Sequence, residues 1–102
     1  MDETEFNRLA DAMLKRIEDA LDAQELDLEV KPGGVIEVEF DDGSKIIINR
    51  HTAAREIWVA ARSGGYHFRH DEGRWLGTRD GTELMEALGR LVSGQTGRPI
   101  VL

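Results

Sequence analysis

The 102-residue sequence contains no cysteine. This absence excludes disulfide bonds, thiolate metal sites and a cysteine nucleophile. Any metal ion that the chain binds must therefore be held by carboxylates, imidazoles, carbonyl groups or water. Such ligands suit hard cations or, through histidine, borderline ones.

Long apolar runs and a targeting signal are also missing. No stretch of 18 apolar residues occurs, which excludes a transmembrane helix. The first five residues are acidic and lack the basic and apolar regions of a secretory signal peptide. We therefore expect a cytoplasmic protein without membrane contact. Hydrophobic residues make up 40% and charged residues 32% of the chain, which predicts one globular domain over residues 1–102.

Basic residues are scarce in the first part of the chain. Residues 1–43 hold 14 of the 20 acidic residues but only 4 of the 13 basic ones, and the net charge is −7. This field repels phosphate backbones, so we expect no nucleic-acid partner. It attracts cations and basic protein surfaces instead. Acidity that serves solubility alone is the alternative.

Hydrophobic periodicity predicts the elements. Residues 3–22 carry apolar side chains three and four apart, which indicates an amphipathic helix that Asp2 caps with Glu5. A second helix follows Asp80 and ends at Gly94 and Gly97. Six short alternating segments lie between the helices, and tight turns separate them; they are residues 26–30, 35–40, 44–49, 56–61, 66–70 and 74–76.

This order predicts an α+β fold, a two-layer α–β sandwich. The N- and C-terminal helices pack on one face of an antiparallel sheet of about six strands, because tight turns pair strands in sequence. The other face of the sheet is left toward solvent. The run Ile46–Ile48 is β-branched, and we expect it to form a central strand that is buried on both faces.

Six carboxylates follow one another where the first helix meets the first strand. We call them the acidic ridge: Glu18, Asp19, Asp22, Glu25, Asp27 and Glu29. No basic residue lies among them, and the nearest are Lys15 and Arg16. Like charges at helical spacing destabilise a helix, so keeping them suggests a use. The alternative is a solvated helix face beside a strand edge that charge protects.

The acidic ridge lacks the spacing and the central glycine of a calcium-binding loop. We expect it to bind divalent or trivalent ions weakly, with a dissociation constant of roughly 10⁻⁵–10⁻³ M. The sequence has no phosphate-binding loop, no dinucleotide-binding glycine set and no Gly-x-Ser-x-Gly. It therefore offers no catalytic or cofactor-binding residue, and we do not expect an enzyme.

Trp58 alternates with Ile57 and Val59, so it faces solvent if those two face the helices. An exposed tryptophan on a sheet is a common partner contact. The alternative is partial cover by a long neighbour such as Arg69. The three histidines do not converge at a metal-binding spacing, and we expect them to have ordinary surface or hydrogen-bonding roles.

The central segments resemble a known family. The segments are Gly43–Arg50, Glu56–Ala60 and Ser63–Phe68, with Trp75, Glu5–Phe6, Arg8–Asp11 and the leucine-rich final helix. Together they closely resemble the bacterial frataxin (CyaY-type) family. This resemblance implies the same sandwich fold and a role in iron–sulfur cluster assembly.

In that family the acidic ridge binds iron weakly and docks on a basic patch of the cysteine desulfurase, near the cluster scaffold protein. The resemblance therefore implies Glu18, Asp19, Asp22, Glu25, Asp27 and Glu29 as iron ligands. It implies Trp58 with Glu18, Asp19 and Asp22 as partner contacts. The chain would hold no cluster itself. We expect a monomer, with iron-dependent oligomers as the alternative.

Two departures thin the ridge: Ala23 stands where the family often has an acidic residue, and the link between the first helix and the first strand is shorter than in some relatives. Three functions stay open at this point. The first is an iron-responsive regulator of a cysteine desulfurase. The second is an iron chaperone or ferroxidase-like store, which needs a defined metal site with open positions. The third is a scaffold whose acidity has no specific partner.

Overall fold

The computed structural model describes residues 1–102 and contains two α-helices, one short 3-10 helix and a six-stranded sheet. In chain order these are α1 (Glu3–Ala23), β1 (Asp27–Lys31), β2 (Val35–Glu39), β3 (Lys45–His51), η1 (Thr52–Ala54), β4 (Glu56–Ala61), β5 (Gly64–Asp71), β6 (Arg74–Gly77) and α2 (Leu84–Thr96). The strands lie in the sheet in chain order, each antiparallel to the next. Neither helix combines the length and apolar composition that crossing a bilayer requires.

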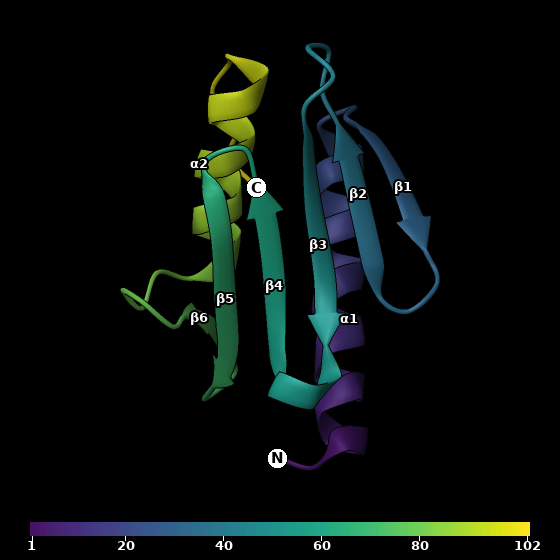
Figure 1. Ribbon diagram of the computed structural model, residues 1–102, viewed down its shortest axis with the longest axis vertical. Helices are drawn as coiled ribbons and strands as arrows, with labels where there is room; N and C mark the ends of the chain where they lie inside the picture. Colours follow the sequence, from purple (N-terminus) through teal and green to yellow (C-terminus); the bar gives the residue numbers. More distant parts are fainter.

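Both helices cover the same face of the sheet. Figure 1 shows α1 behind β2 and β3, and α2 behind β4 and β5. Twenty buried apolar side chains from both layers form one core, including Phe6, Ile17, Ile48, Phe68 and Leu88. The predicted α–β sandwich is therefore confirmed. The opposite face of the sheet is open, and its residues are free to serve other purposes.

The ends of α1 follow from local chemistry. The Asp2 carboxylate accepts a hydrogen bond from the backbone N–H of Glu5 at 2.8 Å, which confirms the predicted cap. At the other end, Leu26 N–H donates to Leu21 O and Glu25 N–H donates to Asp22 O. These two bonds close the helix in the arrangement that normally places glycine at the position of Glu25.

Two sequence predictions about the elements are wrong. Ile47 is 37% exposed while Ile46 and Ile48 are buried, because β3 is covered by helices on one face only. A strand in the middle of this sheet is buried on one face only, because both helices lie on the same side of the sheet. Gly94 lies within α2 instead of ending it; Gly97, with φ of 76°, is the residue that ends the helix.

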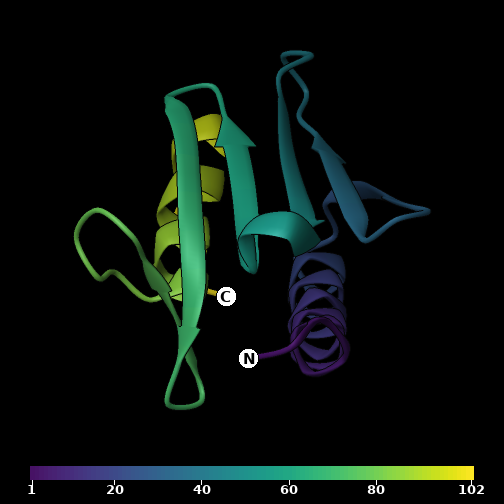
Figure 2. The same cartoon turned by 60° about the horizontal axis from the view of Figure 1, so that its bottom comes forward.

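The C-terminal residues tie the two helices together. The hydroxyl of Ser93 accepts a hydrogen bond from Ile100 N–H at 2.8 Å, and Ile100 is buried. Arg98 donates to the carbonyl of Gln24 at 3.2 Å, and the Gln24 amide donates to Val101 O at 3.4 Å. Figure 2 shows the C-terminus between α1 and α2. This tail closes the gap between the helices at the end of the molecule where the acidic ridge lies.

Candidate functional site

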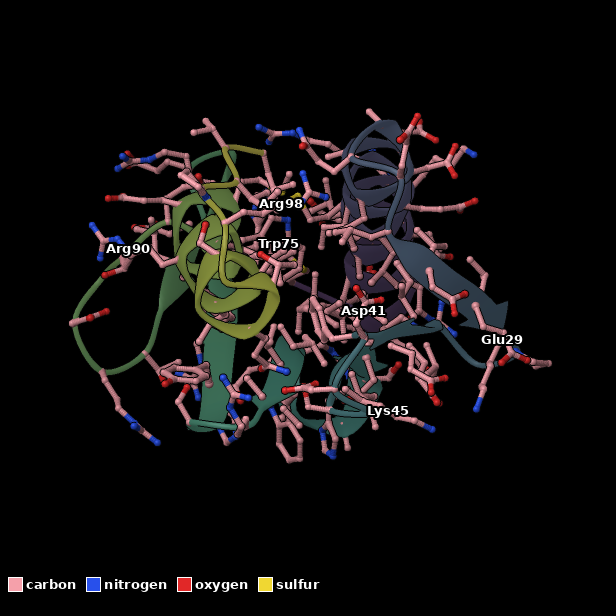
Figure 3. The ribbon with its side chains drawn as sticks, turned by 90° about the horizontal axis from the view of Figure 1, so that it is seen from above. Glu29, Asp41, Lys45, Trp75, Arg90 and Arg98 are labelled. Carbon is pink, nitrogen blue, oxygen red and sulfur yellow. The ribbon has the colours of Figure 1, made fainter.

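The acidic ridge lies at the surface where α1 ends and β1 begins. Asp19, Asp22, Glu25, Asp27 and Glu29 are exposed, and Glu18 is half-buried. Figure 3 shows Glu29 on β1 at the outer edge of the sheet, on the far side of the molecule from Arg90 of α2. The ridge therefore occupies one flank of the molecule and is open to any partner that approaches from that side.

Lysine partly neutralises the helical end of the ridge. Lys15 Nζ lies 3.2 Å from Asp19 Oδ1 and 3.8 Å from Glu18 Oε2, and these carboxylates raise the pKa of Lys15 through a hydrogen bond and charge attraction. The Lys15 side chain is 65% exposed, so both ion pairs contribute little to stability. Glu18 and Asp19 nevertheless present less net negative charge than the sequence suggested.

The strand end of the ridge is also next to lysines. Glu37 of β2 is the cross-strand partner of Glu29, and its two oxygens lie 2.6 Å from Lys31 Nζ and 2.6 Å from Lys45 Nζ. Hydrogen bonds from these two lysines lower the pKa of Glu37 to about 2. Glu29 faces this cluster without an ion pair of its own. The two lysines thus offset the repulsion between Glu29 and Glu37.

The middle of the ridge has no basic partner. Asp22, Glu25 and Asp27 form no ion pair in the structure. Asp22 stands near the C-terminal end of α1, where the helix dipole disfavours negative charge, and the last turn contains no basic residue. Glu25 has a φ of 58°, a conformation that glycine adopts far more easily. Asp22 and Glu25 are held where they reduce stability, which favours a use at this place.

Further acidic residues extend the ridge around its end, and sequence reasoning missed them. A hollow of about 410 Å³ is lined by Glu25 and Asp27 together with Glu39, Asp41 and Asp42, and the basic residue Arg98 lines it as well. Asp27 and Glu39 are direct cross-strand partners in β1 and β2. The register of this hairpin is the signal that could have found Glu39, because it places residue 39 opposite residue 27. Asp42 is partly neutralised by Arg62 at 2.9 Å.

The carboxylates of the ridge do not form a closed metal site. No three His, Asp or Glu side chains in the chain come together closely enough to hold a metal ion between them. Carboxylate oxygens suit iron as ligands, yet exposed ones on separate elements leave most coordination positions to water. The ridge can therefore attract hydrated cations and basic surfaces, whereas a tight, defined ion site would require these side chains to move together.

Trp58 lies on the open face of the sheet, as its alternation with buried Ile57 and Val59 predicted, but it is half-buried. His51 stacks on one side of its indole with ring centroids 3.7 Å apart and planes 12° apart. His67 stacks on the other side at 4.4 Å and 10°. The cover comes from these two histidines, while Arg69, the expected cover, contacts Glu56.

Glu56 completes this cluster and was missed by sequence reasoning. Its Oε1 accepts a hydrogen bond from Trp58 Nε1 at 2.8 Å, and its Oε2 accepts one from Arg69 Nε at 2.7 Å. Burial alone would raise the pKa of the Glu56 carboxyl, but the hydrogen bonds from Trp58 and Arg69 outweigh burial and lower that pKa. Glu56 therefore stays ionised beneath the stacked rings.

The strand register brings these residues together. Trp58 is the direct cross-strand partner of His67, and Glu56 is the partner of both His51 and Arg69. The two-residue turn between Ala61 and Gly64 sets the register of β4 and β5. The predicted segments 56–61 and 66–70 leave a connection of four residues between them, which hides the pairing of Trp58 with His67.

Comparison with known proteins supports the family assigned from sequence. Residues 1–98 match the model of the frataxin-like domain. The iron–sulfur cluster assembly protein CyaY of Dechloromonas aromatica is 59% identical over 104 residues, covering 100% of this chain and 99% of that protein. The protein of the same name from Ralstonia nicotianae is 52% identical over 105 residues, covering 98% and 93%.

Solved structures agree with the sequence relatives. Frataxin from Psychromonas ingrahamii superposes with a TM-score of 0.88 at 27% identity, covering 99% of this chain and 97% of that one. Trimeric frataxin from Saccharomyces cerevisiae, crystallised with ferrous iron, superposes with a TM-score of 0.77 at 26% identity, covering 88% and 87%. The chain therefore belongs to the frataxin (CyaY) family, a family of non-enzymatic iron–sulfur cluster assembly proteins.

Proposed function

We propose that residues 1–102 act as one frataxin-like domain in the cytoplasm that regulates iron–sulfur cluster assembly. The domain docks as a monomer through its acidic ridge on a complex of cysteine desulfurase and scaffold protein, and Trp58 makes a second contact. Iron binds weakly along the ridge and is cargo or signal, never a resident cofactor. The observation that carries this proposal is the unpartnered middle of the ridge, Asp22, Glu25 and Asp27.

The charge arrangement supports a protein partner. Exposed carboxylates without ion pairs favour a basic surface, because they gain attraction on docking without first losing a partner. The open geometry of the ridge supports weak iron binding, since no three side chains converge on one point. A store or ferroxidase needs a defined site with open positions, and this arrangement favours the regulator over that function.

A charge-reversal experiment tests the proposal. The variant Asp22→Lys, Glu25→Lys, Asp27→Lys should lose binding to the desulfurase–scaffold complex and lose its effect on the desulfurase rate. A matched control with the same change in net charge, Glu3→Lys, Asp71→Lys, Glu72→Lys, alters exposed residues away from the ridge. It should keep both. Native binding and native rate effect in the ridge variant would contradict the proposal.

A titration with ferrous iron separates the regulator from the store. For the regulator, the NMR signals of Glu18, Asp22 and Asp27 should shift gradually, weakly and less in high salt. Tight, stoichiometric binding with oxidation of Fe(II) to Fe(III) would favour the ferroxidase-like store. The same titration on the triple ridge variant shows whether the bound iron is at the ridge.

A further inference from the structure

The cluster around Trp58 contains the one buried charged residue of the chain. Glu56 is only 5% exposed, and every other residue that is buried is apolar or glycine. Removing a carboxylate from water is costly unless its oxygens gain good partners. Oε1 of Glu56 accepts a hydrogen bond from the indole N–H of Trp58 and lies 3.6 Å from His67 Nδ1, and Oε2 accepts one from Arg69. The burial of Glu56 is thus linked to the position of the Trp58 side chain.

The three contacts together leave the indole little freedom. A tryptophan on an open sheet face normally has several staggered orientations available. Here His51 covers one face of the ring, His67 covers the other, and Glu56 binds its only polar atom. Any change of rotamer would break the hydrogen bond and both stacks. The contacts therefore select one orientation before any partner arrives.

We propose that Glu56, His51 and His67 are positioning residues that hold the Trp58 indole in one binding-ready orientation and leave an edge of the ring for the partner. This inference rests on the proposed role of Trp58 as a partner contact. Because both ring faces are covered, a partner meets the edge of the indole and the outer surfaces of the imidazoles. Holding the side chain in advance removes the entropy loss of fixing it on binding.

The first test uses the free chain and its two tryptophans. In Glu56→Ala and His67→Ala, the NMR signal of the Trp58 indole N–H should shift. The exchange of this proton with water should become about tenfold faster, because the first variant removes the hydrogen bond to the indole and the second removes a ring that holds the indole in place. The signal of Trp75, which is buried and packs on Phe6, should stay unchanged and report an intact fold. An unchanged Trp58 signal in both variants would overturn the proposal.

Conservative variants separate positioning from a merely structural role. Glu56→Gln keeps an oxygen for the indole N–H, and His67→Phe keeps a stacking ring, so both should retain the native Trp58 signal. Both should also bind the desulfurase–scaffold complex within about twofold of the native chain, whereas the two alanine variants should bind about two- to tenfold more weakly. Glu86→Ala, which breaks an exposed ion pair with Arg90 on α2, serves as the control.

The outcomes distinguish this inference from the proposed function. A loosened indole in the alanine variants with native affinity would overturn the positioning role. Equal losses of affinity in the alanine and conservative variants would also overturn it. A native chain that fails to bind the complex overturns the proposed function, while the indole measurements on the free chain still decide whether these residues hold Trp58.

Discussion

At the scale of single residues, the candidate site contains a residue whose backbone conformation is unfavourable. Glu25 has a φ of 58° at the position after the helix cap, where glycine is preferred. A non-glycine residue in this conformation costs roughly 1–2 kcal/mol. The chain accepts this cost at a residue whose carboxylate stands in the unpartnered middle of the ridge. Such a conflict between local preference and sequence is expected at functional positions.

Replacing Glu25 tests whether its backbone conformation reduces the stability of the fold. Glu25→Gly should raise the free energy of unfolding by about 1 kcal/mol, because glycine adopts the conformation without strain. Glu25→Gln removes the charge but keeps the strain, so its stability should lie close to that of the native chain. Urea unfolding of the three proteins measures the difference. A glycine variant no more stable than the glutamine variant would refute the argument.

At the scale of elements, charge pairs join the first three strands on the open face. Lys31 of β1 and Lys45 of β3 both contact Glu37 of β2, and this lowers the pKa of Glu37 to about 2. A carboxyl whose pKa is lower in the folded than in the unfolded chain stabilises the fold above the unfolded pKa. That contribution is lost as the pH falls from about 4.5 to about 2.

The pH dependence of unfolding should reveal this pair of contacts. Between pH 4.5 and 2 the native chain should lose more stability than Glu37→Gln, which has no carboxyl to protonate at this position. Lys31→Met with Lys45→Met removes the cause of the shift and should flatten the same part of the curve. Chemical unfolding at a series of pH values measures it. Parallel curves for the native chain and Glu37→Gln would show that the lysines do not stabilise the ionised form.

The elements were readable from sequence because their signals are local. The apolar stripe of α1 and the period of two in β4 depend on neighbours in the chain, and the structure has both. The prediction that Ile47 is buried was wrong, because a run of β-branched residues has the same sequence pattern whether helices cover one face of the strand or both. The cluster of His51, Glu56 and His67 depends on register across three strands, and a predicted turn that is two residues too long conceals it.

The same distinction applies to the acidic ridge. Its six carboxylates lie close together between residues 18 and 29 and were found in the sequence. Glu39 and Asp41, in contrast, reach the hollow only through the β1–β2 pairing and the turn after it. Ion pairs were equally hidden, because Lys45 reaches Glu37 from a third strand. Residues that share a spacing pattern in the sequence could be predicted as a group. Residues that meet only through strand pairing could be identified only from the fold.

At the scale of the whole molecule, charge is divided between two flanks. Residues 1–43, which form α1, β1 and β2, hold 14 of the 20 acidic residues and 4 of the 13 basic ones. These elements lie together on one side of Figure 1, with β5 and β6 on the other. A molecule with such a field turns as it approaches a charged partner, and the ridge meets a basic surface first.

Ionic strength should therefore act on the rate of association. The rate constant for association with the desulfurase–scaffold complex should fall by about tenfold between low salt and about 0.5 M, while the dissociation rate changes less. Stopped-flow or surface binding measurements give both rates. The triple ridge variant should lose this dependence, and the matched control should keep it. A salt-independent association rate in the native chain would contradict steering by the ridge.

The tail that joins the helices has a consequence for how the chain is made. Each strand pairs with its neighbour in sequence, so the sheet can assemble step by step as the chain leaves the ribosome. The end of α1, however, is bound by Arg98 and Val101 through Gln24. Helix α1 thus obtains contacts from residues that lie 74 and 77 positions later in the chain. Completion of the ridge flank waits until Arg98 and Val101 have been made, and a nascent chain that stops short of these residues lacks the tie.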